Sequence, residues 1–323
     1  MSDIREGLRR GSFYAKGFMN MIIPGRILSS LLDTEFKKLD ASQKHEIEER
    51  AEYYVKLPKN ASVSFSGSTK ISDFRFPWRK QDRHSAYFLD LFPYLHILPH
   101  HLRFNYFAGD TDVEAKCPTF IKSRPIVNGS SYSALCRLNS LRHYRFVNDN
   151  IPFESKANKV VSRNEVRLQS WRTRLLEMYA DNAMMDFGQI NTDCGRPEWV
   201  KPFMSIHDQL KHKFVMCIRG HDVATNLKWV MSSNSLAVMP RPSVESWFQE
   251  GLLMPDIHYV EIKDDYSDLP ERVEWFITHP KEARDIIHNA NQWTMRFRNI
   301  HVERCAMAVA VRRYFEQTGQ LIL

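Results

Sequence analysis

The sequence lacks the features that mark a membrane-spanning or secreted protein. Nowhere do about 18 apolar residues follow one another, so no helix is expected to cross a bilayer. The apolar run at residues 19–23 is too short for a secretory leader and is interrupted by Pro24. We therefore expect a cytoplasmic protein.

Cysteine is scarce and follows no recognisable pattern. The thiols are odd in number, lie far apart and show neither Cys-x-x-Cys nor Cys/His ligand spacing. Buried free thiols in a reducing compartment are therefore predicted, rather than a disulfide framework or a zinc site. The five positions are Cys117, Cys136, Cys194, Cys217 and Cys305.

No internal repeat is visible, and no Lys/Arg-rich tract with interleaved aromatic residues. The 45 basic residues exceed the 38 acidic ones and give a net charge of +7. This excess suits an anionic small molecule or an acidic membrane surface, and nucleic acid is the weakest of the three candidate partners.

The segment 5–38 mixes basic and apolar residues, and two interpretations of it stay open. It can rest on the anionic face of a bilayer, or it can pack on its own domain. The basic members are Arg9, Arg10, Lys16, Arg26, Lys37 and Lys38.

What the chain does contain is enough apolar sequence for two domains. At 323 residues with 43% hydrophobic content, two domains of about 150 residues are expected. A polar, turn-rich stretch at 148–152 marks the predicted boundary. We predict domains at 1–150 and 151–300, followed by a C-terminal helix at 301–323.

Strands alternate with helices after that boundary. Strands are predicted at 159–162, 213–218, 236–239 and 258–262, with helices through 171–179, from 223 and over 244–250. Such alternation indicates a parallel, doubly wound sheet. In the first half, strands are predicted at 102–107 and 119–122 and a helix at 133–143.

The most informative segment is 213–229, where an apolar strand ends at Arg219-Gly220 and a helical pattern follows. A strand that turns through glycine into a helix start presents backbone N–H groups and the positive end of the helix dipole. Arg219 adds planar donors that suit phosphate. The alternative is an ordinary strand–helix turn with a solvated arginine.

From Arg219 onward the chain resembles glycosyltransferase family 90. The resemblance rests on residues 219–229 and 231–235, continues through 245–251, 258–259 and 264–269, and appears upstream at 122–126 and 138–143. It spans roughly residues 60–300. The bacterial branch of lipopolysaccharide glycosyltransferases fits better than the secreted eukaryotic protein O-glucosyltransferases and capsule xylosyltransferases.

The resemblance implies an α/β fold of GT-B type, with two Rossmann-like domains facing each other across a cleft and C-terminal helices packing back. It implies a UDP-sugar donor, inversion at the anomeric carbon and no obligatory metal or other cofactor. Asp110-Thr111-Asp112 and the adjacent Asp264 and Asp265 leave the question of a cation open.

The resemblance also suggests site residues. The base that deprotonates the acceptor hydroxyl is expected after the strand at 102–107, as Asp110 or alternatively Asp112, although Gly109-Asp110 also suits a plain turn. Lys122 and Arg124 are expected to line the cleft. The donor-binding candidates are Arg163, Arg219, Gly220, Asp222, Asn226, Lys228, Glu245 and Glu250; because Asn226 and Lys228 cannot face one side of a helix together, one of them is expected to be structural.

The predicted function is transfer of a sugar from a UDP-sugar to a hydroxyl of a lipopolysaccharide or lipooligosaccharide core, with possible peripheral contact of the enzyme with the anionic inner membrane. A non-catalytic protein that binds sugar nucleotides or glycans on the same scaffold is the alternative. The sequence alone does not determine the donor sugar, the linkage or the oligomeric state.

Overall fold

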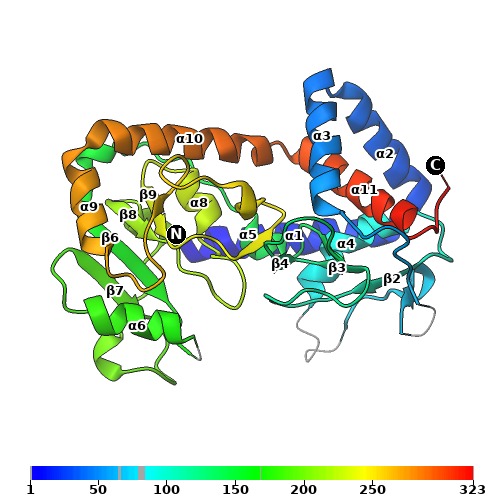
Figure 1. Ribbon diagram of the computed structural model, residues 1–323. Helices are drawn as coiled ribbons and strands as arrows, with labels where there is room; N and C mark the ends of the chain where they lie inside the picture. Colours follow the sequence, from blue (N-terminus) through cyan, green and yellow to red (C-terminus); the bar gives the residue numbers. More distant parts are fainter. Residues whose placement is uncertain (1, 65–66, 79–83, 168, 323) are drawn as a thin grey trace. The chain divides into compact units, whose positions relative to one another are not determined.

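The computed structural model describes residues 2–64, 67–78, 84–167 and 169–322 (Figure 1). The chain forms two compact units. Unit 1 comprises Met1–Tyr144, Val244–Gln249 and Phe297–Leu323, and unit 2 comprises Arg145–Ser243 and Glu250–Arg296. The chain passes from unit 1 to unit 2 after Tyr144 and enters unit 1 for the last time at Phe297. It also returns briefly to unit 1 at 244–249, which the sequence analysis did not anticipate.

The helices of unit 1 pack around its C-terminal helix. Helix α11 contacts α2, α3 and α4, and buried side chains of α3 and α11 share a small apolar core with Leu39. Arg50 and Glu303 form an ion pair inside this bundle, each 1% exposed. The helices are α1 (Ser2–Ile22), α2 (Gly25–Lys38), α3 (Ala41–Tyr54), α4 (Ser85–His96), α5 (Ser140–His143) and α11 (Ile300–Gln317).

A mixed sheet completes unit 1. Its strands lie in the order β1 (Thr69–Lys70), β2 (Arg103–Tyr106), β3 (Thr119–Ile121) and β5 (Ser133–Leu135), with β1 antiparallel and the others parallel. The helix predicted at 133–143 is wrong, because residues 133–138 are buried all round and the first three pair with β3. Only residues 140–143 become helical, as α5.

A second correction concerns residues 244–250, which were predicted to be helical. Val244–Ser246 instead form strand β10, antiparallel to β4 (Ser123–Pro125). In this register Glu245 lies opposite Arg124 and the two side chains form an ion pair. Because Arg124 and Glu245 are far apart in the sequence, the residues around either of them do not indicate this strand pairing.

Unit 2 contains the parallel sheet that the alternation predicted (Figure 1). All neighbouring strands are parallel, in the order β11-β9-β8-β6-β7. The strands are β6 (Ala157–Asn164), β7 (Met185–Gln189), β8 (His212–Met216), β9 (Leu236–Met239) and β11 (Val260–Glu261). The helices are α6 (Ser170–Tyr179), α7 (Ile206–Gln209), α8 (Leu227–Met231), α9 (Leu269–Thr278) and α10 (Pro280–Arg298).

The strand order defines where unit 2 can bind a ligand. From β6 the chain adds β7 on one side and then β8, β9 and β11 on the other, so the winding reverses between β6 and β8. In doubly wound sheets, ligands bind beyond the carboxyl ends of the strands at this reversal. A ligand site of unit 2 is therefore expected at the loops that follow β6 and β8.

Among the described residues, no helix is both long enough and apolar enough to cross a membrane.

Candidate active site

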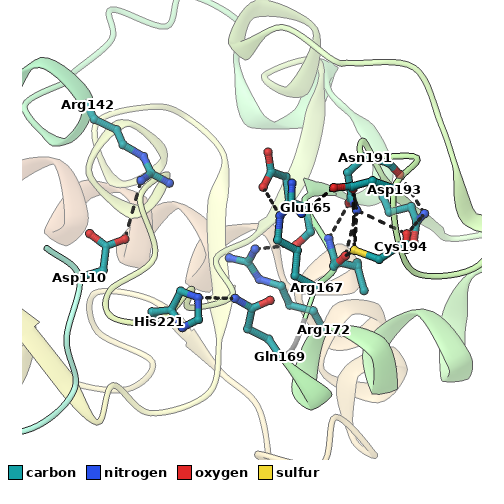
Figure 2. Close-up of polar contacts among 12 residues, drawn as sticks. Asp110, Arg142, Glu165, Arg167, Gln169, Arg172, Asn191, Asp193, Cys194 and His221 are labelled. Carbon is teal, nitrogen blue, oxygen red and sulfur yellow. Dashed lines mark hydrogen bonds and ion pairs between the residues drawn. The ribbon is translucent and has the colours of Figure 1, made fainter. Parts of the chain in front are cut away.

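The loops after β6 and β8 meet at the reversal point of unit 2. Trp171 and Arg172, in the first turn of α6, both donate side-chain hydrogen bonds to the carbonyl oxygen of Arg219, at 3.0 and 3.1 Å. The Arg219 guanidinium lies over the Trp171 ring, 4.4 Å from its centre. Gln169 and His221 join the same two loops through their side chains at 3.2 Å (Figure 2). The position of Arg219 is therefore determined by α6.

This corner concentrates positive charge next to exposed backbone. A Cβ atom built on Gly220 would lie 3.4 Å from Nη2 of Arg172, an ordinary van der Waals contact. The Arg172 guanidinium thus lies next to Gly220, the Arg219 guanidinium lies over Trp171, and both Trp171 and Arg172 belong to the first turn of the ten-residue helix α6. Guanidinium groups and a helix start both favour a phosphate.

The helix start at this corner is not the one predicted. A helix was expected to follow Gly220 directly, but α8 begins only at Leu227 and is five residues long. The loop between them is held down by Asn226, whose amide donates to the carbonyl of Met216 at 3.0 Å. The helix whose first turn lies beside Arg219 is α6 instead. Trp171 and Arg172 were not among the predicted site residues, because their contact with Arg219 depends on the order of the strands.

Arg163 was predicted to bind the donor diphosphate, and in the structure its guanidinium makes five hydrogen bonds within unit 2. They are accepted by the carbonyl oxygens of Pro202, Ser162 and Asp186 and by both carboxylate oxygens of Asp186. A phosphate at Arg163 would have to replace or share one of these contacts, and donor binding by Arg163 stays a prediction.

Lys228 and Glu250 were predicted to bind the donor, but they form an ion pair with each other. Their side chains are 1% and 2% exposed. Asp222, another candidate, is also only 2% exposed. Because each charge of the pair has its counter-charge in the interior, we assign the Lys228–Glu250 pair a role in the stability of unit 2. The Asn226 amide also has an internal partner, the carbonyl of Met216. Donor binding by Asp222, Asn226, Lys228 and Glu250 stays a prediction.

Replacing Lys228 with methionine is expected to lower the free energy of unfolding by about 3–5 kcal/mol, because the buried Glu250 carboxylate loses the counter-charge of its ion pair. Chemical denaturation measures this loss. Adding Glu250→Gln to Lys228→Met should recover most of it. The exposed pair of Lys211 and Asp208 supplies the control, since Lys211→Met should cost less than about 1 kcal/mol. Equal costs for the two lysine variants would refute the assignment.

In unit 1, Arg124 and Glu245 form a second buried pair, 2.9 Å apart and at most 1% exposed. Arg124 also donates to the carbonyl oxygens of Tyr53, Tyr54 and Ser133. Glu245 thus lies on a strand and not on the predicted helix, while the predictions that Arg124 lines the cleft and that Glu245 binds the donor stay predictions. Both side chains hold β4 and β10 to the neighbouring elements.

Asp110, the candidate base, lies in a cluster of polar side chains in unit 1. Its Oδ1 atom accepts hydrogen bonds from the Lys122 amine and, at 3.2 Å, from the Tyr87 hydroxyl. Arg142 lies 3.8 Å from the other carboxylate oxygen (Figure 2). The Lys122 amine is also 3.3 Å from Nε2 of His143. Asp110 remains 28% exposed, so a substrate can still reach it.

The charges around Asp110 control its protonation. Burial alone would raise the pKa of Asp110, but the Lys122 amine, followed by Arg142 and the Tyr87 hydroxyl, brings it below its ordinary value of 3.8. Asp110 is therefore ionised throughout the physiological range. Asp112, the alternative base, is exposed. Lys122 itself is 1% exposed, and its predicted place in the lining of the cleft stays a prediction.

The Lys122→Met variant is expected to shift the acid limb of the pH–rate profile upward. Burial raises the pKa of Asp110 and the Lys122 amine is the strongest of the groups that lower it, so removing this charge raises the pKa of Asp110. Activity measured from pH 4 to 8 tests this. The exposed Lys116 is the control, and Lys116→Met should leave the profile unchanged. Superimposable profiles for wild type and Lys122→Met would rule out the coupling.

Comparison with known proteins places the chain among the glycosyltransferases. The family model described as "Glycosyl transferase family 90" matches residues 138–314. The O-glucosyltransferase LpsA of Dichelobacter nodosus is 34% identical over 306 residues, which make up 94% of this chain and 94% of that protein. The chain belongs to glycosyltransferase family 90. The resemblance noted in the sequence is thereby confirmed, and the protein is a glycosyltransferase.

An animal protein also matches a shorter part of the chain. Protein O-glucosyltransferase 2 of Danio rerio is 31% identical over 85 residues, 26% of this chain and 16% of that protein. The family model covers both loops that meet at Arg219, whereas Asp110 lies upstream of the matched residues.

Proposed function

We propose that this family 90 enzyme transfers a sugar from a UDP-sugar to a hydroxyl of a lipopolysaccharide or lipooligosaccharide core, with inversion at the anomeric carbon. The proposal of a UDP-sugar donor rests on the position of Arg219 and Gly220 at the reversal point of a parallel sheet. A diphosphate is the part of a UDP-sugar that such a corner suits.

In this proposal Arg219 binds the diphosphate and stabilises the charge that develops as UDP leaves. Arg172, in the first turn of α6, fixes Arg219 by donating a hydrogen bond to its carbonyl oxygen. Guanidinium and backbone N–H groups then supply the charge balance that a metal supplies in other transferases, so we propose that no metal is required. The units are proposed to act as the two domains of a GT-B enzyme.

Asp110 is the proposed base. Its carboxylate takes the proton of the acceptor hydroxyl as the oxygen attacks the anomeric carbon and the bond to the diphosphate breaks. A single displacement of this kind inverts the configuration. Ionisation of Asp110 at neutral pH, secured by Lys122, is the property that supports this role.

A lipid-linked acceptor suggests a peripheral enzyme at the cytoplasmic face of the inner membrane. Helices α1 and α2 of unit 1 expose apolar side chains, although Leu28 and Leu32 are buried on an adjoining face of α2. Both earlier interpretations of this segment thus have support, since one face packs and another is exposed. The exposed apolar residues are Leu8, Met19, Ile22, Ile27 and Leu31.

A panel of UDP-sugars, screened by thermal shift and then by transfer to purified core oligosaccharide, tests the proposal. A donor bound by the folded state raises the melting temperature, by an amount that grows with its concentration relative to Kd. We expect one UDP-sugar to stabilise the protein more than UDP alone and to be transferred with inversion. Stabilisation by none of the UDP-sugars would refute the donor assignment. The non-catalytic alternative has no observation in its favour.

A further inference from the structure

A cavity of about 200 Å³ lies inside unit 1, apart from the carboxylate of Asp110. Helices α1, α2, α4 and α11 and the segment after β5 enclose it. One part of its wall is apolar and includes Leu28, Leu32 and Leu89. The other part carries charge, and no role in the transfer reaction requires it.

Three cationic side chains from three different elements line this cavity. They are Lys16 of α1, Arg137 after β5 and Arg304 of α11. They lie close enough to repel one another: burial first, and then the charges of Arg304 and Arg137, lower the pKa of Lys16. Because neighbouring cations repel one another, binding of an anion between them is favourable.

The acidic groups nearby do not balance these cations. Arg137 is 8% exposed, and its Nε atom has no hydrogen-bond partner among the described residues; the nearest carboxylate oxygen, from Glu303, is 3.8 Å away. That carboxylate is paired with Arg50. Glu35 neutralises Arg304 at 2.6 Å, but within the described part of the chain no carboxylate pairs with Lys16. A buried donor without an acceptor is costly unless a ligand satisfies it.

The one carboxylate that lines the cavity is already engaged. Asp90 accepts hydrogen bonds from the backbone N–H of Ser140 at 2.7 Å and from its hydroxyl at 2.6 Å. It thereby fixes the start of α5. With Arg304 paired to Glu35, the charges of Lys16 and Arg137 still outnumber that of Asp90, so the described lining keeps a positive excess.

We propose that this cavity binds a phosphate monoester, with the phosphate on Lys16, Arg137 and Arg304 and the organic part against the wall that contains Leu28, Leu32 and Leu89. A tetrahedral dianion offers acceptors in several directions and matches donors that arrive from three elements. The headgroup of phosphatidic acid and a free sugar phosphate share this chemistry. The proposal does not depend on the glycosyl-transfer assignment.

Isothermal titration of the full-length protein with inorganic phosphate, against chloride at equal ionic strength, tests the site. We expect saturable binding that is weakened about tenfold or more in Lys16→Glu, equivalent to about 1.4 kcal/mol. Lys37→Glu is the matched control, an exposed lysine of α2 outside the cavity lining, and should bind like wild type. Asp90→Asn should bind phosphate more tightly, because it removes the only negative charge of the lining.

Absence of binding to the wild-type protein, or equal weakening in Lys16→Glu and Lys37→Glu, would overturn the proposal. If circular dichroism shows that Lys16→Glu does not fold, Lys16→Gln and Arg304→Gln replace it under the same criteria.

Vesicle sedimentation then separates the two sources of phosphate. If a lipid headgroup is the ligand, phosphatidic acid vesicles bind the protein, phosphatidylcholine vesicles do not, inorganic phosphate competes, and Lys16→Glu loses the binding. If phosphate titration depends on Lys16 but vesicle binding does not, the ligand is a soluble phosphate monoester. Either result supports the site. Loss of both signals in Lys37→Glu as well would assign them to general surface charge.

Discussion

Replacing Arg219 with alanine is expected to lower kcat/KM for glycosyl transfer by about a hundredfold to a thousandfold. Removing one group that stabilises developing charge in an active site costs this much in other enzymes. The fold should persist, because the hydrogen bonds that fix this corner are accepted by the backbone carbonyl of residue 219 and survive the substitution. Initial rates at saturating acceptor, together with a thermal melt, measure both effects.

The matched control for Arg219→Ala is Arg241→Ala in the same unit. Arg241 is 71% exposed and is paired with Glu261. This variant loses one positive charge from unit 2 but none from the proposed donor corner, so its turnover should match that of wild type. Near-normal turnover in Arg219→Ala, or the same loss in both variants, would contradict the donor assignment.

Replacing Asp110 with asparagine is expected to lower kcat by about 10²–10⁴-fold while the affinity for UDP stays within about twofold of wild type. The size of the loss is that of a missing general base. Asparagine keeps an oxygen that can accept from Tyr87 and Lys122, so the cluster should stay folded. Single-turnover transfer and UDP titration separate the chemical step from donor binding.

The same pair of measurements on Asp112→Asn distinguishes the two candidate carboxylates. The structure favours Asp110, which is positioned by three side chains, whereas Asp112 is exposed. A large loss confined to Asp112→Asn would transfer the role of base to that residue. A loss of UDP affinity in Asp110→Asn would show instead that unit 1 contributes to the donor site.

Elements that neighbouring residues specify could be predicted from the sequence. Strand β9 occupies the predicted residues 236–239, and β8 begins one residue before the predicted strand at 213–218. The run of four buried residues in β9 is the usual signature of a central parallel strand. Alternation of such strands with helices was enough to predict the parallel sheet, and from it the place where Arg219 lies.

Contacts between distant residues could not be predicted. Glu245 pairs with Arg124, 121 positions away, and this pairing makes residues 244–246 a strand although they were predicted to be helical. The same holds for Arg163, whose donors are taken up by Asp186 and Pro202. From the sequence alone, an arginine whose guanidinium is hydrogen-bonded within the protein cannot be distinguished from one that binds a ligand.

Trp171 and Arg172 show the opposite error. They were placed in a helix with an apolar face, and their polar atoms were given no role. Only the strand order reveals that α6 begins beside the end of β8, where these side chains reach the carbonyl of Arg219. The chemistry of the corner therefore depends on topology as much as on the residues of the matching segment.

A crystal structure of the protein with UDP bound tests the central claim most directly. The account predicts that the diphosphate lies at the carboxyl ends of β6 and β8, within hydrogen-bonding distance of the Arg219 guanidinium and facing the first turn of α6. A diphosphate bound elsewhere in the chain, with Arg219 still stacked on Trp171 and out of reach, would contradict it.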